Sequence, residues 1–216
     1  PENRLLARGP RMRLPAEMVR DQALYASGLL VERIGGPSVK PYQPAGVWSE
    51  LGGKDYEPDH GEGLYRRSLY TFWKRTAPPP FMSTFDSATR ESCTVRMSST
   101  NTPLQALNLM NDVTFLEASR KLAERAIHKA EKSPDKRLEY EFRRVLARFP
   151  NENERQWLLD SLNYYRDRFE TNRKSAEDYV ARGESDRDAS IDVAELAAYM
   201  AVASLIFNLD ETITKE

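Results

Sequence analysis

Six cationic side chains alternate with aromatic residues between positions 64 and 96. The cations are Arg66, Arg67, Lys74, Arg75, Arg90 and Arg96, and the aromatics are Tyr65, Tyr70, Phe72 and Trp73. A guanidinium group binds a carboxylate, sulfate or phosphate through two parallel hydrogen bonds. An aromatic face stacks on sugar rings or on guanidinium planes. The segment therefore predicts a site for an anionic carbohydrate or an acidic partner.

The same arginines also fit a purely structural role. Acidic residues that could pair with them are Asp86, Glu91, Asp112 and Asp210. Structural ion-pair networks imitate ligand sites, and they are the more common of the two arrangements. The ligand-binding set is thus a hypothesis with a competing structural interpretation.

Four polar residues continue the candidate set on one side of a predicted helix. Asn101, Gln105, Asn108 and Asp112 are three or four positions apart, which places them on a common helical face. A polar stripe is usually the solvated face of a helix. If it faced the arginines instead, Asn101, Gln105 and Asp112 would help to orient a bound anion.

The residue types for catalysis and metal binding are sparse, and no catalytic residue is assigned. The two histidines, His60 and His128, are far apart in sequence, so we expect no metal site. The single cysteine, Cys93, cannot form an internal disulfide, and we expect it to be a buried apolar residue. The sequence has no CxxCH motif for a c-type haem, so no cofactor is expected in this chain.

The charge balance and the longest apolar run exclude two classes of function. Lys and Arg number 32 against 33 Asp and Glu, a formal net charge of −1, whereas nucleic-acid binders usually carry a basic excess. The longest apolar run, residues 196–209, is shorter than the roughly 20 residues that a membrane helix needs. We therefore predict no nucleic-acid partner, no membrane span and a buried C-terminal helix.

Hydrophobic periodicity and capping residues predict helices along most of the chain. Thr102 with Pro103 and Gln105 predicts a capping box, Asn151 with Glu154 predicts a second, and Asp112 and Asp192 are further caps. Asp86 could cap a short turn through Arg90, and residues 64–76 also suit a short strand. The predicted helices are residues 15–34, 64–76, 103–111, 113–127, 137–148, 151–169, 175–181 and 192–209.

Residues 35–63 are rich in proline and glycine and show no periodicity, which predicts a long irregular segment. It is either a strap across a helix pair or one wall of a cleft. The predicted fold class is therefore mainly α: a helical bundle with a long irregular Pro/Gly-rich insertion in the N-terminal half. All of residues 1–216 are assigned to a single helical domain.

Five long segments carry a resemblance to a known family: residues 5–24, 35–48, 64–86, 93–107 and 208–216. In these segments the chain resembles the planctomycete-expanded C-terminal domain of unknown function that is found downstream of planctomycete cytochrome-C-type domains. The resemblance implies a C-terminal fragment of a larger multidomain protein, periplasmic or secreted. It implies no activity.

Two functional hypotheses follow. The first is a non-catalytic interaction or scaffold domain that docks on other domains of the parent protein or on an assembly partner. The second is a unit that binds or hydrolyses anionic polysaccharide through the arginine–aromatic segment. A scaffold predicts internally satisfied arginines and an apolar patch elsewhere, whereas a ligand site predicts a pocket with unpaired arginines.

Overall fold

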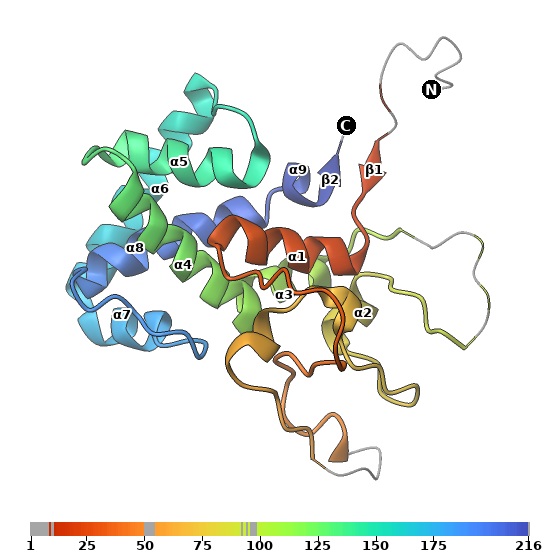
Figure 1. Ribbon diagram of the computed structural model, residues 1–216. Coiled ribbons are helices and arrows are strands. Elements are labelled where there is room, and N and C mark those ends of the chain that lie inside the picture. The colour runs from red at the N-terminus through yellow and green to blue at the C-terminus, as the bar shows by residue number, and fades with distance from the viewer. Residues whose placement is uncertain are drawn as a thin grey trace.

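The chain folds into a bundle of helices that contains very little strand (Figure 1). The computed structural model describes residues 9, 11–49, 55–91, 93, 95 and 99–215. Within these residues the predicted mainly-α class is confirmed. The long helices are α1 (Ala16–Ser27), α3 (Pro103–Asn111), α4 (Val113–Lys129), α5 (Pro134–Leu146), α6 (Glu152–Thr171), α7 (Arg173–Val180) and α8 (Val193–Phe207).

Helix α8 forms the centre of the bundle. Every residue of it except Glu195 and Leu205 is buried, which confirms the buried helix predicted from its apolar sequence. Helices α4, α6 and α7 pack around α8, and α1 packs on α4 (Figure 1). Each large apolar side chain that is fully buried in this way contributes about 1.5–3 kcal/mol to folding. No helix in the described part of the chain is both long enough and apolar enough to cross a bilayer.

Three of the predicted helix starts are confirmed. The side chain of Asp112 accepts a hydrogen bond from the backbone N–H of Thr114 at 2.8 Å and so begins α4. Asn151 and Glu154 form the complete capping box of α6. Asp192 caps α8 by accepting from the backbone N–H groups of its first turn. Each cap satisfies amide donors that would otherwise lack a partner at a helix N-terminus.

Helix α1 is shorter than predicted, because it ends at Ser27 rather than at residue 34. Gly28 adopts a left-handed conformation with φ +84°, and its N–H closes the last turn of α1. A Cβ atom at this position would be 2.1 Å from a guanidinium nitrogen of Arg125. The positive φ favours glycine here, and any larger residue would also have to displace the end of the Arg125 side chain.

The predicted helix over residues 64–76 is wrong. The segment contains two short 3-10 helices, η2 (Gly61–Tyr65) and η3 (Ser68–Tyr70), with parallel bridges from Val31 to Arg66 and from Val39 to Thr71. Buried Arg20 holds this shape by donating to the carbonyls of residues 64 and 66. Bonds from a distant side chain therefore override the helical spacing of the aromatics.

Residues 86–100 also depart from the prediction. Asp86 has φ +59° and accepts hydrogen bonds from the N–H and hydroxyl of Thr100, so it closes a loop instead of capping a turn through Arg90. Cys93 is exposed, contrary to the expected burial. Short helix α2 (Pro80–Thr84) precedes this loop.

The two ends of the described chain meet. Strand β1 (Met12–Arg13) pairs antiparallel with β2 (Thr214–Lys215), which follows short helix α9 (Asp210–Ile213) (Figure 1). The N–H of Leu14 extends the pairing by donating to the carbonyl of Ile213 at 2.8 Å. The chain therefore enters and leaves the bundle at one place.

One ionisable side chain lies inside the bundle without a partner. Glu141 in α5 is completely buried, and neither of its carboxyl oxygens has a hydrogen-bond partner within the described residues. Arg137, one turn earlier, is engaged by Glu195 at 2.7 Å. Burial raises the pKa of Glu141 well above its ordinary value, so the folded state holds this proton at pH values where the unfolded chain has begun to release it.

We expect Glu141→Gln to leave stability unchanged near pH 4 and to stabilise the fold at pH 7–8. Above the unfolded pKa of about 4.3, the unfolded wild-type chain releases a proton that the folded state retains. Its stability then falls by about 1.4 kcal/mol per pH unit until the folded pKa is reached. The glutamine variant lacks this fall. Urea unfolding between pH 4 and 8 measures the difference, and exposed Glu131→Gln is the control; parallel wild-type and Glu141→Gln curves would contradict the prediction.

Candidate functional site

Arg66, the first residue of the predicted cationic set, is a structural residue. Its side chain is fully buried, and it donates to the backbone carbonyls of Arg33, Gly35 and Pro37. Its guanidinium lies over the ring of Tyr70 at 3.9 Å from the ring centre. These contacts fasten the start of the irregular insertion to the body of the protein.

The other cations of the set are dispersed over separate partners. Arg67 is half exposed, with Nε 3.7 Å from a carboxylate oxygen of Asp21. The Lys74 ammonium lies 4.6 Å from the ring centre of Trp48, the Arg90 guanidinium lies 4.4 Å from that of Trp73, and Arg75 is exposed. Arg96 lies outside the described residues. The structure thus shows no common cleft formed by the described cations.

One residue of the predicted polar stripe, Gln105 on α3, is buried. Gln105 is 1% exposed; its carbonyl accepts from Arg13, and its amide donates to the carbonyl of Thr84 at 2.9 Å. These bonds replace the capping box predicted with Thr102, whose side chain makes no cap bond. Asp112 caps α4, its burial raises its pKa, and Asn101 is exposed.

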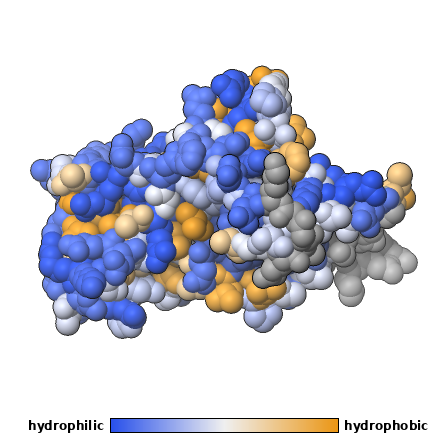
Figure 2. Space-filling view, turned by 90° about the horizontal axis from the view of Figure 1, so that it is seen from below, coloured by the Kyte–Doolittle hydropathy of each residue, from blue (hydrophilic) through white to orange (hydrophobic). Residues whose placement is uncertain are grey.

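Three large apolar side chains of α3 are exposed, although Leu109 of the same helix is buried. Leu104 and Leu107 are each 57% exposed, and Met110 is 42% exposed. They are spaced three residues apart on one helical face. Figure 2 shows hydrophobic residues gathered in patches on a mostly hydrophilic face of the molecule. A helix that exposes several large apolar side chains on one face is typical of a surface that another element covers.

A groove of about 300 Å³ adjoins this face, and we call it the α3 groove. Its walls come from α3, α6, α7 and α8, and three of its aromatic rings stack in sequence, Tyr165 on Phe169 and Phe169 on Tyr179. Arg168 is the charged residue of its lining. The lining residues are Leu107, Met110, Asn111, Tyr165, Arg168, Phe169, Ser175, Tyr179, Ala201, Ser204 and Leu205.

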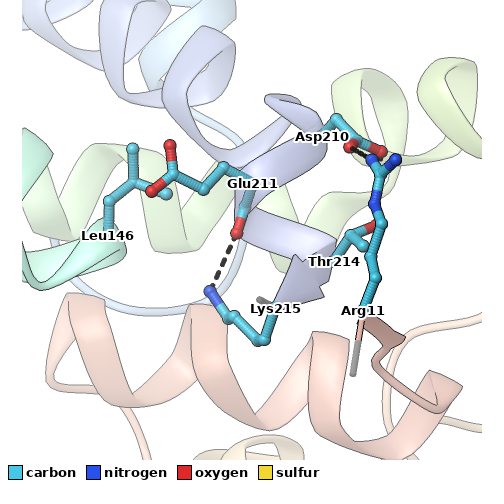
Figure 3. Close-up of a pocket in the computed structure, with 6 residues that line it drawn as sticks. All are labelled: Arg11, Leu146, Asp210, Glu211, Thr214 and Lys215. Atoms are coloured by element: carbon cyan, nitrogen blue, oxygen red, sulfur yellow. Dashed lines mark hydrogen bonds and ion pairs between the residues drawn. The ribbon is translucent and has the colours of Figure 1, made fainter. Parts of the chain in front are cut away.

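A second hollow, of about 380 Å³, lies beside the paired strands (Figure 3). Its polar groups bind one another: Arg11 pairs with Asp210, and the Lys215 ammonium donates to the carbonyl of Glu211 at 3.0 Å. Thr214 also donates to Asp210, at 3.2 Å. Because these groups satisfy one another, we assign this hollow to the closure of the chain ends.

A buried polar cluster, absent from the predicted set, joins α4 to the loop between α7 and α8. Arg120 is 1% exposed and donates to the carbonyl and hydroxyl of Ser185 at 2.6 and 3.0 Å. The fully buried carboxylate of Glu117 accepts from the Ser185 N–H at 2.6 Å and from the Tyr65 hydroxyl at 2.9 Å. Glu124 lies 3.3 Å from Arg120. The spacing of these charges along an otherwise apolar helix face was the available sequence signal.

Both histidines bind the same loop. His60 Nδ1 lies 2.6 Å from Glu184, and His128 Nε2 lies 2.6 Å from Asp188. The hydrogen bond with Glu184 raises the pKa of His60. Each imidazole ring therefore contacts a carboxylate of the loop between α7 and α8, and these contacts attach that loop to the rest of the protein. No group of three or more His, Cys, Asp or Glu side chains in the described part of the chain could hold a metal ion.

Comparison with known proteins places the chain in a family. No curated protein and no solved structure matches it. A family model described as PSD1, protein of unknown function (DUF1553), matches residues 1–162, which is most of the chain. The chain therefore belongs to the PSD1 family of proteins of unknown function.

Proposed function

We propose that this chain is a non-catalytic interaction domain of a secreted or periplasmic multidomain protein, and that the exposed face of α3 with its groove is the docking surface. The observation that carries the proposal is the exposure of Leu104, Leu107 and Met110 on α3, the helix whose buried residues are Gln105 and Leu109. The resemblance to planctomycete domains that follow cytochrome-C-type domains supports the extracytoplasmic setting. The partner is another domain of the parent protein or an assembly partner.

The arrangement of the arginines supports docking over ligand binding. Arg66, which would be central to an anion site, is engaged by three carbonyls, and Arg90 lies against an aromatic ring. The apolar surface offers the larger gain in binding free energy. Covering the half-exposed leucines removes apolar area from water, which contributes about 25 cal/mol per Å². Binding or hydrolysis of anionic polysaccharide stays the alternative, drawing on exposed Arg67 and Arg75.

Methionine oxidation in the native protein that contains this chain tests the docking surface. Met110, Met18 and Met12 are 42%, 53% and 52% exposed here, so they are matched reporters on different elements. If a partner covers α3, peroxide is expected to oxidise Met110 roughly tenfold more slowly than Met18, because sulfoxide formation follows exposure. Mass spectrometry of tryptic peptides gives both rates in one sample.

Two variants complete this test. Leu107→Asp places a charge on the docking surface, and we expect it to raise the Met110 oxidation rate to that of Met18. Leu69→Asp changes a residue that is 70% exposed on η3, away from the groove, and we expect no effect on Met110. Equal oxidation of Met110 and Met18 in the wild-type native protein would show that α3 is uncovered and would refute the docking surface.

A further inference from the structure

The α3 groove has a chemical polarity that specifies its occupant. Arg168 is its charged lining residue, and its side chain is exposed. No carboxylate pairs with Arg168 among the described residues. By contrast, Arg166 on the same helix lies 3.7 Å from Glu195, and Arg173 at the start of α7 pairs with Asp192. On α6 and α7, Arg168 is therefore the arginine that can pair with a carboxylate from outside the chain.

The rest of the lining is mainly apolar and aromatic, with Asn111, Ser175 and Ser204 as further polar residues. The stacked rings of Tyr165, Phe169 and Tyr179 line the groove together with Leu107 and Met110 of α3. Asn111 donates one of its two amide hydrogens to the carbonyl of Leu107 at 2.8 Å. A volume of about 300 Å³ accommodates one or two large apolar side chains.

The exposed stripe of α3 extends this groove along a helical direction. Leu104, Leu107 and Met110 recur every three residues, and such a stripe packs against the matching stripe of a second helix. A partner that matches this surface needs an apolar stripe with a carboxylate next to it. An acidic amphipathic helix has both. A guanidinium binds a carboxylate through two parallel hydrogen bonds, and that pairing sets the register of the docked helix.

We propose that the α3 groove binds an acidic amphipathic helix of the partner, whose apolar side chains enter the groove and whose Asp or Glu pairs with Arg168. This inference rests on the proposed docking function and adds the chemistry of the partner. Charge complementarity carries it: a mainly apolar lining with one cation that no described carboxylate pairs selects an apolar segment with a neighbouring anion.

Two synthetic helical peptides of about 15 residues test the proposal. Both carry leucine or phenylalanine at positions i, i+3, i+4 and i+7, and the flanking positions are glutamate in one and lysine in the other. They are titrated into the chain labelled at its methionine and leucine methyl groups. We expect the acidic peptide to shift the resonances of Met110, Leu107 and Leu205 and to bind about tenfold more tightly than the basic one.

Charge reversal at Arg168 supplies the decisive comparison. Arg168→Glu is expected to reverse the preference between the two peptides, whereas Arg187→Glu, an identical charge change in the exposed α7–α8 loop, leaves it unchanged. Equal binding of both peptides at the groove would overturn the acidic partner while leaving a docking surface in place. Absence of methyl shifts with either peptide would also overturn the proposal, whereas the Met110 oxidation test judges the docking function separately.

A small apolar acid is the remaining competitor. Sodium decanoate is titrated under the same conditions, since it combines an alkyl chain with one carboxylate. If decanoate shifts the groove methyls at lower concentration than the acidic peptide, the groove is a small-molecule site and the helix proposal fails. Weaker binding of decanoate than of the peptide supports the helix, because α3 contributes contacts outside the groove.

Discussion

Arg120→Met is expected to destabilise the fold by about 3–5 kcal/mol, the loss typical when one member of a buried ion pair is removed. The buried carboxyl of Glu117 would lose its ion-pair partner, whereas Glu124 would still pair with Lys121 at 2.6 Å. The carbonyl of Ser185 would also lose its donor, which loosens the α7–α8 loop. Urea unfolding gives the loss, and amide hydrogen exchange of residues 181–192 reports the loosened loop.

A second change in the same cluster distinguishes lost charge balance from lost packing. Glu117→Gln keeps a carbonyl oxygen that can accept from the Tyr65 hydroxyl and the Ser185 N–H, but it removes the unpaired charge. In the Arg120→Met background it should therefore recover part of the lost stability. Lys129→Met, an exposed cation on the same helix, should change stability by no more than about 0.5 kcal/mol. If Arg120→Met lowers stability as little as Lys129→Met does, the cluster does not hold the α7–α8 loop.

Helix starts were predictable because their determinants are local. The capping bonds of Asp112, Asn151 and Asp192 all end within three residues of the cap. A short sequence window contains both partners of such a bond, so the residue pattern and the physical cause coincide. The same holds for α8, whose all-round apolar sequence requires burial in the centre of a bundle.

The N-terminal half was not predictable in this way, because distant side chains set its backbone. Arg20 reaches the carbonyl of Leu64, 44 positions later, and Asp21 accepts from the N–H of Ser68, 47 positions later. The aromatics between 64 and 76 follow helical spacing, yet these bonds hold 3-10 turns and bridges instead. Hydrophobic periodicity within a short segment carries no information about a hydrogen-bond donor 44 positions away in the sequence.

The candidate surface was only partly predictable for a related reason. The stripe of Leu104, Leu107 and Met110 is visible in the sequence, but an apolar stripe looks the same whether the core or a partner covers it. The groove beside it combines residues from four helices that lie as far apart as Leu107 and Leu205. Its unpaired Arg168 becomes distinctive only when the pairing of its neighbours is known.

Arg66 provides the sharpest test of whether the arginine–aromatic segment is structural. Arg66→Met should destabilise the fold by about 2–4 kcal/mol, because three carbonyls lose a charged donor and Tyr70 loses its stacked cation. The loss should appear first as faster amide exchange in residues 31–39, since the insertion detaches from the body at that point. Urea unfolding and hydrogen exchange measure the two effects.

Lysine at the same position separates the two interpretations of this residue. A lysine keeps the positive charge, which an anion site mainly needs. Its ammonium group lacks the branched donor geometry with which the guanidinium reaches the carbonyls of Arg33, Gly35 and Pro37. If Arg66 is structural, Arg66→Lys should be at least as destabilising as Arg66→Met, because it buries an ammonium with too few acceptors. Exposed Arg67→Met should stay within about 0.5 kcal/mol of wild type. A stable Arg66→Met variant that loses sulfate binding retained by Arg66→Lys would instead favour the anion site.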